Sequence, residues 1–112
     1  MDVNFYVCPV CGNVTVSSGD AEVKCCGRTL KKEQVGISQG MKVSVSDGEY
    51  YVSVGHPMTK DHYFSFVAAV SDSSVQFVKL FPEGKAEARF RMDGVDRIYM
   101  YCTRHGLYVK KI

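Results

Sequence analysis

The chain has 112 residues, of which 46% are hydrophobic, and a formal net charge of +2. This length suits one domain with at most a small appendage, and the weak, dispersed positive charge argues against a nucleic-acid partner. The longest apolar run, residues 63–70, contains Ser65 and falls well short of the ~20 residues of a membrane span. We therefore expect a soluble protein that binds neither nucleic acid nor a membrane.

The first thirty residues contain few large apolar side chains, so a folded unit of that size needs a metal or disulfides. They hold Cys8 and Cys11 in CPVC, and Cys25 and Cys26 in CCG, each group followed by a glycine. Four thiolates satisfy the tetrahedral preference of zinc or iron, and a Cys-x-x-Cys turn places two sulfurs on one side of an ion. The spacing predicts one four-cysteine metal site, in which the second pair is contiguous.

Cysteine usage also indicates the compartment. The chain has five cysteines, an odd number, and no signal peptide precedes Cys8. Neighbouring residues such as Cys25 and Cys26 are poorly placed to form a disulfide with each other. We expect reduced, metal-bound thiolates and a cytoplasmic location rather than a secreted disulfide framework.

Residues 31–40 are polar, contain two glycines and show no sustained period, which predicts a linker. We place the domain boundary there, with a metal module over residues 1–36 and a second domain over 37–112. Next, residues 41–46 and 50–54 alternate polar with apolar around Asp47-Gly48, the strongest short-range signal for a β-hairpin.

Short strands with turn signals continue to the end of the chain, and no segment has a long helical period. The further predicted strands are residues 62–70, 75–81, 85–91, 97–101 and 107–112. Strands at intervals of about ten residues are typical of an antiparallel all-β sandwich. The predicted fold class is therefore all-β, with a sandwich following a small metal module.

The remaining cysteine and all three histidines form a second group: His56 and His62 in HPMTKDH, and Cys102 and His105 in YCTRHG. Imidazole suits iron, and a thiolate is a ligand that raises the electron density on a metal. A Cys-x-x-His spacing lets one loop reach two coordination positions. These four residues are the candidate catalytic and metal-binding residues.

Both groups resemble a known family. FYVCPVCGN with the later CCG resembles desulforedoxin and the N-terminal domain of desulfoferrodoxin, which implies one rubredoxin-type iron on Cys8, Cys11, Cys25 and Cys26; a structural zinc is the alternative. HPMTKDHY, VKLFPEGKAEARF and YCTRHGLYVKKI resemble the superoxide reductase domain of desulfoferrodoxin and neelaredoxin. That resemblance implies an immunoglobulin-like sandwich, with His56, His62 and His105 as equatorial ligands of a ferrous iron and Cys102 as the axial ligand.

The chain departs from the family at one point. The family's fourth equatorial histidine lies in an upstream Glu-Lys-His segment, but no histidine precedes His56, and residues 39–42 offer no imidazole. The family's glutamate and lysine of that segment are missing too, and neither Lys42 nor Lys60 matches the motif. The second site is thus predicted to hold iron less tightly and to be open to zinc or to remain empty.

The resemblance implies an enzyme that reduces superoxide to hydrogen peroxide, with the N-terminal iron relaying electrons from a rubredoxin-like donor, in a homodimer. Two other functions stay open: an electron-transfer or metal-sensing protein that has lost the oxygen chemistry, and a structural metal protein with zinc. A water or side-chain ligand in place of the missing histidine keeps the enzyme possible, whereas a closed four-coordinate site favours the other two.

Overall fold

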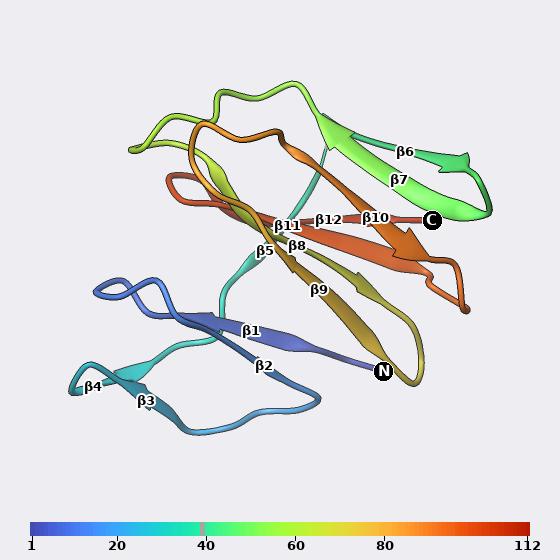
Figure 1. The fold of residues 1–112 in the computed structure, drawn as a ribbon. Coiled ribbons are helices and arrows are strands. Elements are labelled where there is room, and N and C mark those ends of the chain that lie inside the picture. Colours follow the sequence, from blue (N-terminus) through green and yellow to red (C-terminus); the bar gives the residue numbers. More distant parts are fainter. Residues whose placement is uncertain (39) are drawn as a thin grey trace. The chain divides into compact units, whose positions relative to one another are not determined.

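A computed structural model describes residues 1–38 and 40–112, and all regular secondary structure in those ranges is β-strand. The strands fall into two compact units, Met1–Gln34 and Val35–Ile112. Figure 1 labels the strands along the chain.

The first unit is built from two hairpins. Strand β1 (Asn4–Val7) pairs antiparallel with β2 (Val14–Ser17), and β3 (Val23–Cys25) pairs antiparallel with β4 (Arg28–Leu30). Their apolar cluster is small. It consists of buried Tyr6, Cys8 and Leu30, with Val23 and Cys25 packed against them. So little apolar burial leaves the unit dependent on other contacts.

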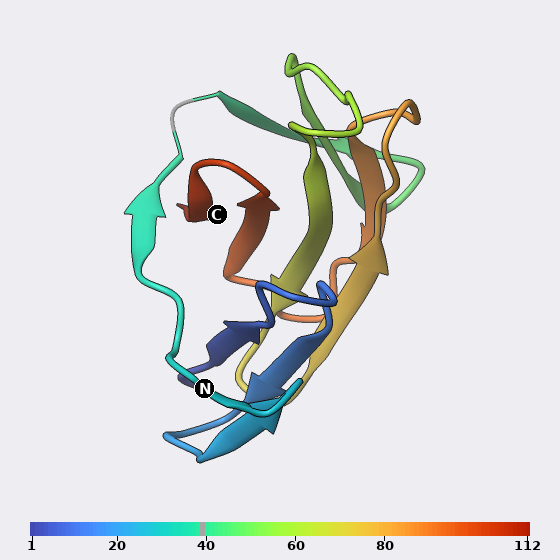
Figure 2. The same ribbon diagram turned by 90° about the vertical axis from the view of Figure 1, so that its left-hand side faces the viewer.

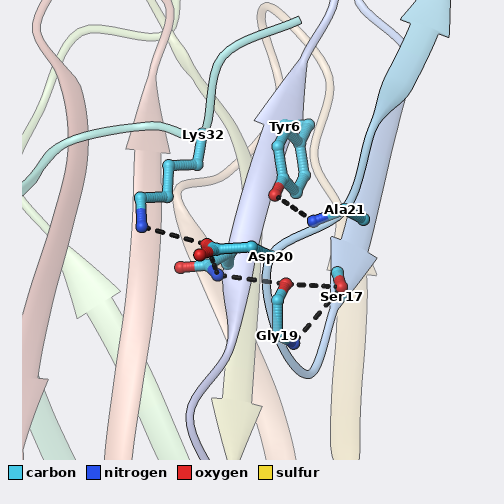
Figure 3. A network of polar contacts seen from close by, with 7 residues as sticks. Tyr6, Ser17, Gly19, Asp20, Ala21 and Lys32 are labelled. Carbon is cyan, nitrogen blue, oxygen red and sulfur yellow. Dashed lines mark hydrogen bonds and ion pairs between the residues drawn. The ribbon is translucent and has the colours of Figure 1, made fainter.

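Polar contacts tie the connection between β2 and β3 to the rest of the first unit (Figure 3). The backbone N–H of Ala21 donates to the Tyr6 hydroxyl over 3.1 Å, and the Ser17 hydroxyl donates to the Gly19 carbonyl over 2.6 Å. Lys32 Nζ lies 3.1 Å from a carboxylate oxygen of Asp20. Exposed pairs of this kind contribute little free energy, so they fix the path of the chain more than they stabilise it.

The second unit contains two sheets (Figure 1). The smaller has the strand order β10-β7-β6 and the larger the order β5-β12-β11-β8-β9. The strands are β5 (Val35–Ile37), β6 (Met41–Ser46), β7 (Glu49–Val54), β8 (Phe64–Val70), β9 (Val75–Lys79), β10 (Glu87–Arg91), β11 (Arg97–Cys102) and β12 (Gly106–Lys111).

The core of the second unit lies between its two sheets. Both sheets contribute to one buried cluster, which comprises Met41, Val52, Phe64, Val67, Ala69, Leu80, Ala88, Phe90, Val95, Ile98, Met100 and Cys102. Side chains two positions apart on a strand share a face, so Ile98, Met100 and Cys102 form one inward row on β11. The last member of this row is a residue of the second predicted site.

The β6–β7 hairpin forms as predicted around Asp47-Gly48. Ser46 pairs with Glu49, so the loop has two residues, and both have positive φ, 53° for Asp47 and 75° for Gly48. Two such residues make the type I′ turn, whose twist matches that of the flanking strands. An aspartate followed by a glycine tolerates these angles, which is why Asp47-Gly48 in the sequence predicts the hairpin correctly.

The predicted linker is partly wrong, because residues 35–37 form strand β5 of the larger sheet. This strand runs parallel to β12, with Gly36 opposite Tyr108. It is the edge strand of the larger sheet and is drawn in teal in Figure 2. Three residues are too few to show a period, and the partner strand lies about seventy positions away. Gln39, which belonged to the predicted linker and to the segment without imidazole, lies outside the described residues.

The all-β sandwich with a preceding cysteine module is confirmed. Among the strand pairs of the described residues, β5 with β12 is parallel and the others are antiparallel. Over residues 1–38 and 40–112, we find no helix that is long and apolar enough to cross a membrane.

Candidate metal centres

The sulfurs of Cys8, Cys11, Cys25 and Cys26 meet at the turns of the two hairpins of the first unit. All four cysteines are free thiols, and their Sγ atoms lie within 4.8 Å of one another. The Cys11 and Cys25 sulfurs are 3.5 Å apart, and those of Cys25 and Cys26 are 4.0 Å apart. A tetrahedral ion with metal–sulfur distances of about 2.3 Å needs sulfurs about 3.8 Å apart. The residues therefore fit such an ion.

Backbone geometry explains the two cysteine motifs. In the first, the N–H of Gly12 donates to the Cys8 carbonyl over 2.9 Å, and Gly12 has a φ of 76°. In the second, Cys26 and Gly27 have φ of 53° and 75° and are the two loop residues of the β3–β4 hairpin. A type I′ turn requires positive φ at both positions. The contiguous pair therefore arises because Cys25 ends a strand and Cys26 begins its turn.

The electrostatics of this cluster favour a cation. The backbone N–H of Cys11, and to a lesser extent that of Val10, lowers the pKa of Cys8 to about 6 against the opposing effect of burial. Hydrogen bonds from neighbouring sulfurs, first that of Cys11, raise the pKa of Cys25 and raise that of Cys26 to about 12. Cys8 thus loses its proton more readily than Cys25 and Cys26 do. A bound cation would displace those protons.

The second group is assembled at one end of the sandwich from two connections. His56 follows β7, and His62 lies just before β8, where the backbones of Thr59 and His62 pair over 3.0 and 3.2 Å. Cys102 is the last residue of β11, and His105 lies in the turn before β12. His62 was predicted within a strand, but β8 begins only at Phe64.

The four donor atoms of the second group are close enough to share one ion. They all lie within 4.8 Å of one another. The Cys102 sulfur is 3.5 Å from His105 Nδ1 and 3.8 Å from His56 Nε2, and His62 Nε2 is 3.3 Å from His105 Nδ1. Ligands at about 2.0–2.3 Å from one ion lie up to roughly 4.6 Å apart, and these three separations of 3.5, 3.8 and 3.3 Å fall inside that limit. Three imidazole nitrogens and one sulfur thus meet the geometric requirement of a metal site.

Hydrogen bonds and ring contacts orient the histidines. His56 Nδ1 donates to the Pro57 carbonyl over 2.6 Å, which leaves Nε2 as the lone-pair nitrogen facing Cys102. The rings of His56 and Phe64 are 4.4 Å apart, and those of His56 and His62 are 4.5 Å apart. A metal-binding histidine usually has its other nitrogen bonded in this way.

A β-bulge places the cysteine. Tyr101 pairs with Phe66 of β8, but the next residue, Cys102, pairs with Phe64, so Ser65 is the extra residue. The bulge explains why Phe64 and Val67, three positions apart, share the buried cluster. Bulges commonly re-aim side chains at the ends of strands. Here it leaves Cys102 buried beside the ring of Phe64, with its sulfur toward the histidines.

Sequence reasoning missed one positioning residue, Thr103. Its hydroxyl accepts the backbone N–H of Tyr63 over 3.2 Å, and its own N–H donates to the Tyr63 carbonyl over 3.0 Å. These bonds join the turn that carries His105 to the residue after His62. In the sequence, only the position of Thr103 between Cys102 and His105 could have indicated this role.

Burial and positive charge keep His62 neutral. Its pKa lies below the ordinary value, first because of desolvation and then because of the neighbouring charges of His56, His105 and Arg104. Neutral imidazole is the form that binds a metal. Cys102 is buried, His56 and His62 are half-buried, and His105 is exposed.

A cavity of about 250 Å³ adjoins this second group. Its lining comprises Ser38, Gly40, Val54, Gly55, His56, Phe64, Cys102, His105 and Tyr108. Three of the four donor residues thus form part of its wall, and His62 does not.

The chain is similar to known proteins in both sequence and fold. The family model described as desulfoferrodoxin matches residues 29–111. A desulfoferrodoxin homolog of Archaeoglobus fulgidus is 33% identical, with 92% of each chain covered, and a desulfoferrodoxin of Nitratidesulfovibrio vulgaris is 31% identical, with 90% of each covered. Among solved structures, the superoxide reductase from Treponema pallidum superposes with a TM-score of 0.85 at 25% identity over 98% of both chains.

Proposed function

Because this chain belongs to the desulfoferrodoxin family, we propose that it is an iron-dependent superoxide reductase, which converts superoxide to hydrogen peroxide. The observation that carries the proposal is the convergence of three histidine nitrogens and the Cys102 sulfur within 4.8 Å of one another. The solved superoxide reductase with the same fold supports it. We propose His56, His62, Cys102 and His105 as the metal ligands and catalytic residues.

The donor set suits iron. Imidazole is a good ligand for ferrous iron, and a thiolate raises the electron density on the metal. Iron held there would supply the one electron that, with two protons, converts superoxide to hydrogen peroxide.

The chain's own residues contribute position, charge and access. The Pro57 carbonyl fixes the tautomer of His56, and Thr103 ties the turn of His105 to the segment after His62. Burial of Cys102 shields its sulfur from bulk water, while the exposure of His105 leaves an approach for a substrate of two atoms.

For the first unit, we propose a single metal ion on Cys8, Cys11, Cys25 and Cys26. Iron there would relay electrons from a rubredoxin-like donor to the second site, whereas zinc would only stabilise the unit. The sulfur separations suit both ions, so metal analysis must decide between them. We further propose that the protein acts as a homodimer in the cytoplasm.

The test is to reconstitute the full chain with ferrous iron under argon, count the bound iron and measure superoxide consumption. We expect two iron ions per chain and consumption of superoxide with one hydrogen peroxide formed per superoxide. Dismutation would instead give one peroxide for two superoxides. Iron binding at both sites without superoxide consumption would favour the electron-transfer function, which the set of three rather than four histidines keeps open.

A further inference from the structure

The cavity beside the second site has an uncharged wall. Beyond Cys102 and two histidines, its described lining residues are Phe64, Tyr108, Val54, Ser38 and two glycines. None of these lining residues is an aspartate, glutamate, lysine or arginine. These side chains offer apolar and aromatic contact but no fixed charge, so an anion there would have a bound metal ion as its only charged partner, whereas a neutral ring can also pack against the wall. The cavity therefore suits a small, neutral, flat ligand.

Three of the four donor residues border the cavity. His56, Cys102 and His105 line it, whereas His62 lies against the rings of the other two histidines, at 4.5 Å from His56 and 4.9 Å from His105. An ion held by the four residues would therefore lie beside the cavity. A donor atom of a molecule in the cavity can complete the coordination.

We propose that this cavity is a binding site for a small neutral nitrogen heterocycle of the imidazole class, which adds a further nitrogen ligand to the metal. The inference rests on the proposed metal site of the histidine–cysteine group. The 250 Å³ volume accommodates a five-membered ring, and the rings of Phe64 and Tyr108 offer it faces for stacking.

The wall also contains a position from which the chain could supply the same ligand itself. A Cβ atom built on Gly40 meets only Val54 Cγ2, at 3.7 Å, which is ordinary contact. Gly40 has no positive φ, so a side chain there is not strained. A Gly40→His substitution can therefore place an imidazole in the cavity, and Gly40→Leu can fill it without a donor.

The experiment uses Co²⁺ as a spectroscopic probe of the full chain, with imidazole as the added ligand and azide as an anionic comparator. The Cys102→Ser chain, which keeps the four-cysteine cluster, provides the background spectrum. We expect imidazole to give a saturable change in the Co²⁺ spectrum that Cys102→Ser lacks. The affinity for Co²⁺, corrected for cobalt–imidazole complexes in solution, should rise about tenfold at ten times the imidazole Kd.

The variants separate the effect of filling the cavity from the effect of supplying a nitrogen ligand to the metal. Gly40→His should bind Co²⁺ more tightly than the native chain and lose its response to imidazole, and Gly40→Leu should lose the response without the gain. Val54→Phe fills the same space from the end of β7 and serves if a Gly40 variant does not fold. Gly19→His is the matched control, because a Cβ on Gly19 meets nothing within 4 Å and lies in the first unit.

Failure of the inference is distinct from failure of the proposed function. If native and Cys102→Ser chains bind Co²⁺ identically without imidazole, the metal site itself is wrong. If only the native chain shows the second site but imidazole changes nothing, or azide binds it more tightly than imidazole, the inference is wrong. An imidazole response that survives in Gly40→His, Gly40→Leu and Val54→Phe would also overturn it, since the ligand would then bind elsewhere.

Discussion

Cys102 stands at the end of an inward row of core residues, where a buried sulfur faces two imidazoles at 3.5 and 3.8 Å. Serine in its place offers a neutral hydroxyl that neither donates charge nor matches the reach of sulfur. We expect Cys102→Ser to reduce superoxide consumption of the iron-loaded chain at least about 100-fold, since even outer-shell changes cost 10–100-fold.

The matched control for that change is Cys26→Ser, which alters the first cluster and leaves the second intact. In a single-turnover assay with pre-reduced protein, Cys26→Ser should keep the rate of the native chain. Equal rates for the native chain and Cys102→Ser would mean that the Cys102 sulfur is not a metal ligand on which superoxide consumption depends. The enzymatic function should then be abandoned for the structural one.

A second residue-scale prediction concerns Tyr51 on the outer face of β7. Its hydroxyl donates to the Glu87 carboxylate, which raises its pKa above the ordinary 10; burial adds to the shift, and nearby Arg89 opposes it. A raised folded pKa means that the unfolded chain loses this proton first. The stabilisation is thus complete below pH 10 and is lost as the pH rises from 10 through the folded pKa.

Tyr51→Phe removes that titration. Between pH 9 and pH 11, the native chain should lose more of its free energy of unfolding than Tyr51→Phe does, as measured by chemical denaturation. Parallel loss in the two proteins would contradict the assignment. The ultraviolet titration gives an independent check, because the variant should lack one late-titrating phenol.

Single residues with metal-ligand chemistry could be identified from the sequence, since their side chains leave few other interpretations when they are grouped in motifs. All eight lie in two clusters. Thr103 could not be identified, because a threonine in a turn serves many purposes and its partner Tyr63 is 40 residues away. The cavity was equally invisible, because its wall combines segments that only the fold brings together.

At the scale of elements, the two hairpins of the first unit share only a small apolar cluster. If a metal ion joins their turns, removing it should release them from each other. We expect a chelator to abolish amide-exchange protection in Met1–Gln34 while Val35–Ile112 stays protected. Hydrogen-exchange mass spectrometry measures both units in one sample.

Cys26→Ser, without chelator, should show the same selective loss of protection in the first unit. Unchanged protection of that unit after complete removal of metal would contradict its dependence on the ion. Full amide-exchange protection of the first unit in Cys26→Ser would also contradict that dependence.

Elements whose signals are local could be predicted, and those that depend on distant partners could not. The β6–β7 hairpin is specified by its own turn, with φ of 53° and 75° at Asp47 and Gly48. Strand β5 is specified by β12, a pairing that requires closure of most of the chain. The bulge at Ser65 likewise exists because of the register between β8 and β11. No pattern in residues 62–70 marks it.

At the scale of the whole molecule, every strand of the first unit is a sheet edge, because each of its sheets has only two strands. Open edges pair readily with another chain. We therefore expect a homodimer, with a mass near twice the 12.5 kDa of one chain in sedimentation at micromolar concentration. A monomer at all concentrations up to that range would rule the dimer out.

The two clusters differ in how much of the chain must exist before they can close. The four cysteines are complete once Cys26 has been synthesised, whereas His56 and Cys102 are 46 positions apart and His105 follows them. At about 5–20 residues per second, translation separates Cys26 from His105 by roughly 4–16 s. If both clusters bind metal, the first can meet the cell's metal pool several seconds before the second has all its ligands. Which ion each site acquires would then depend on the timing of synthesis as well as on the ligands.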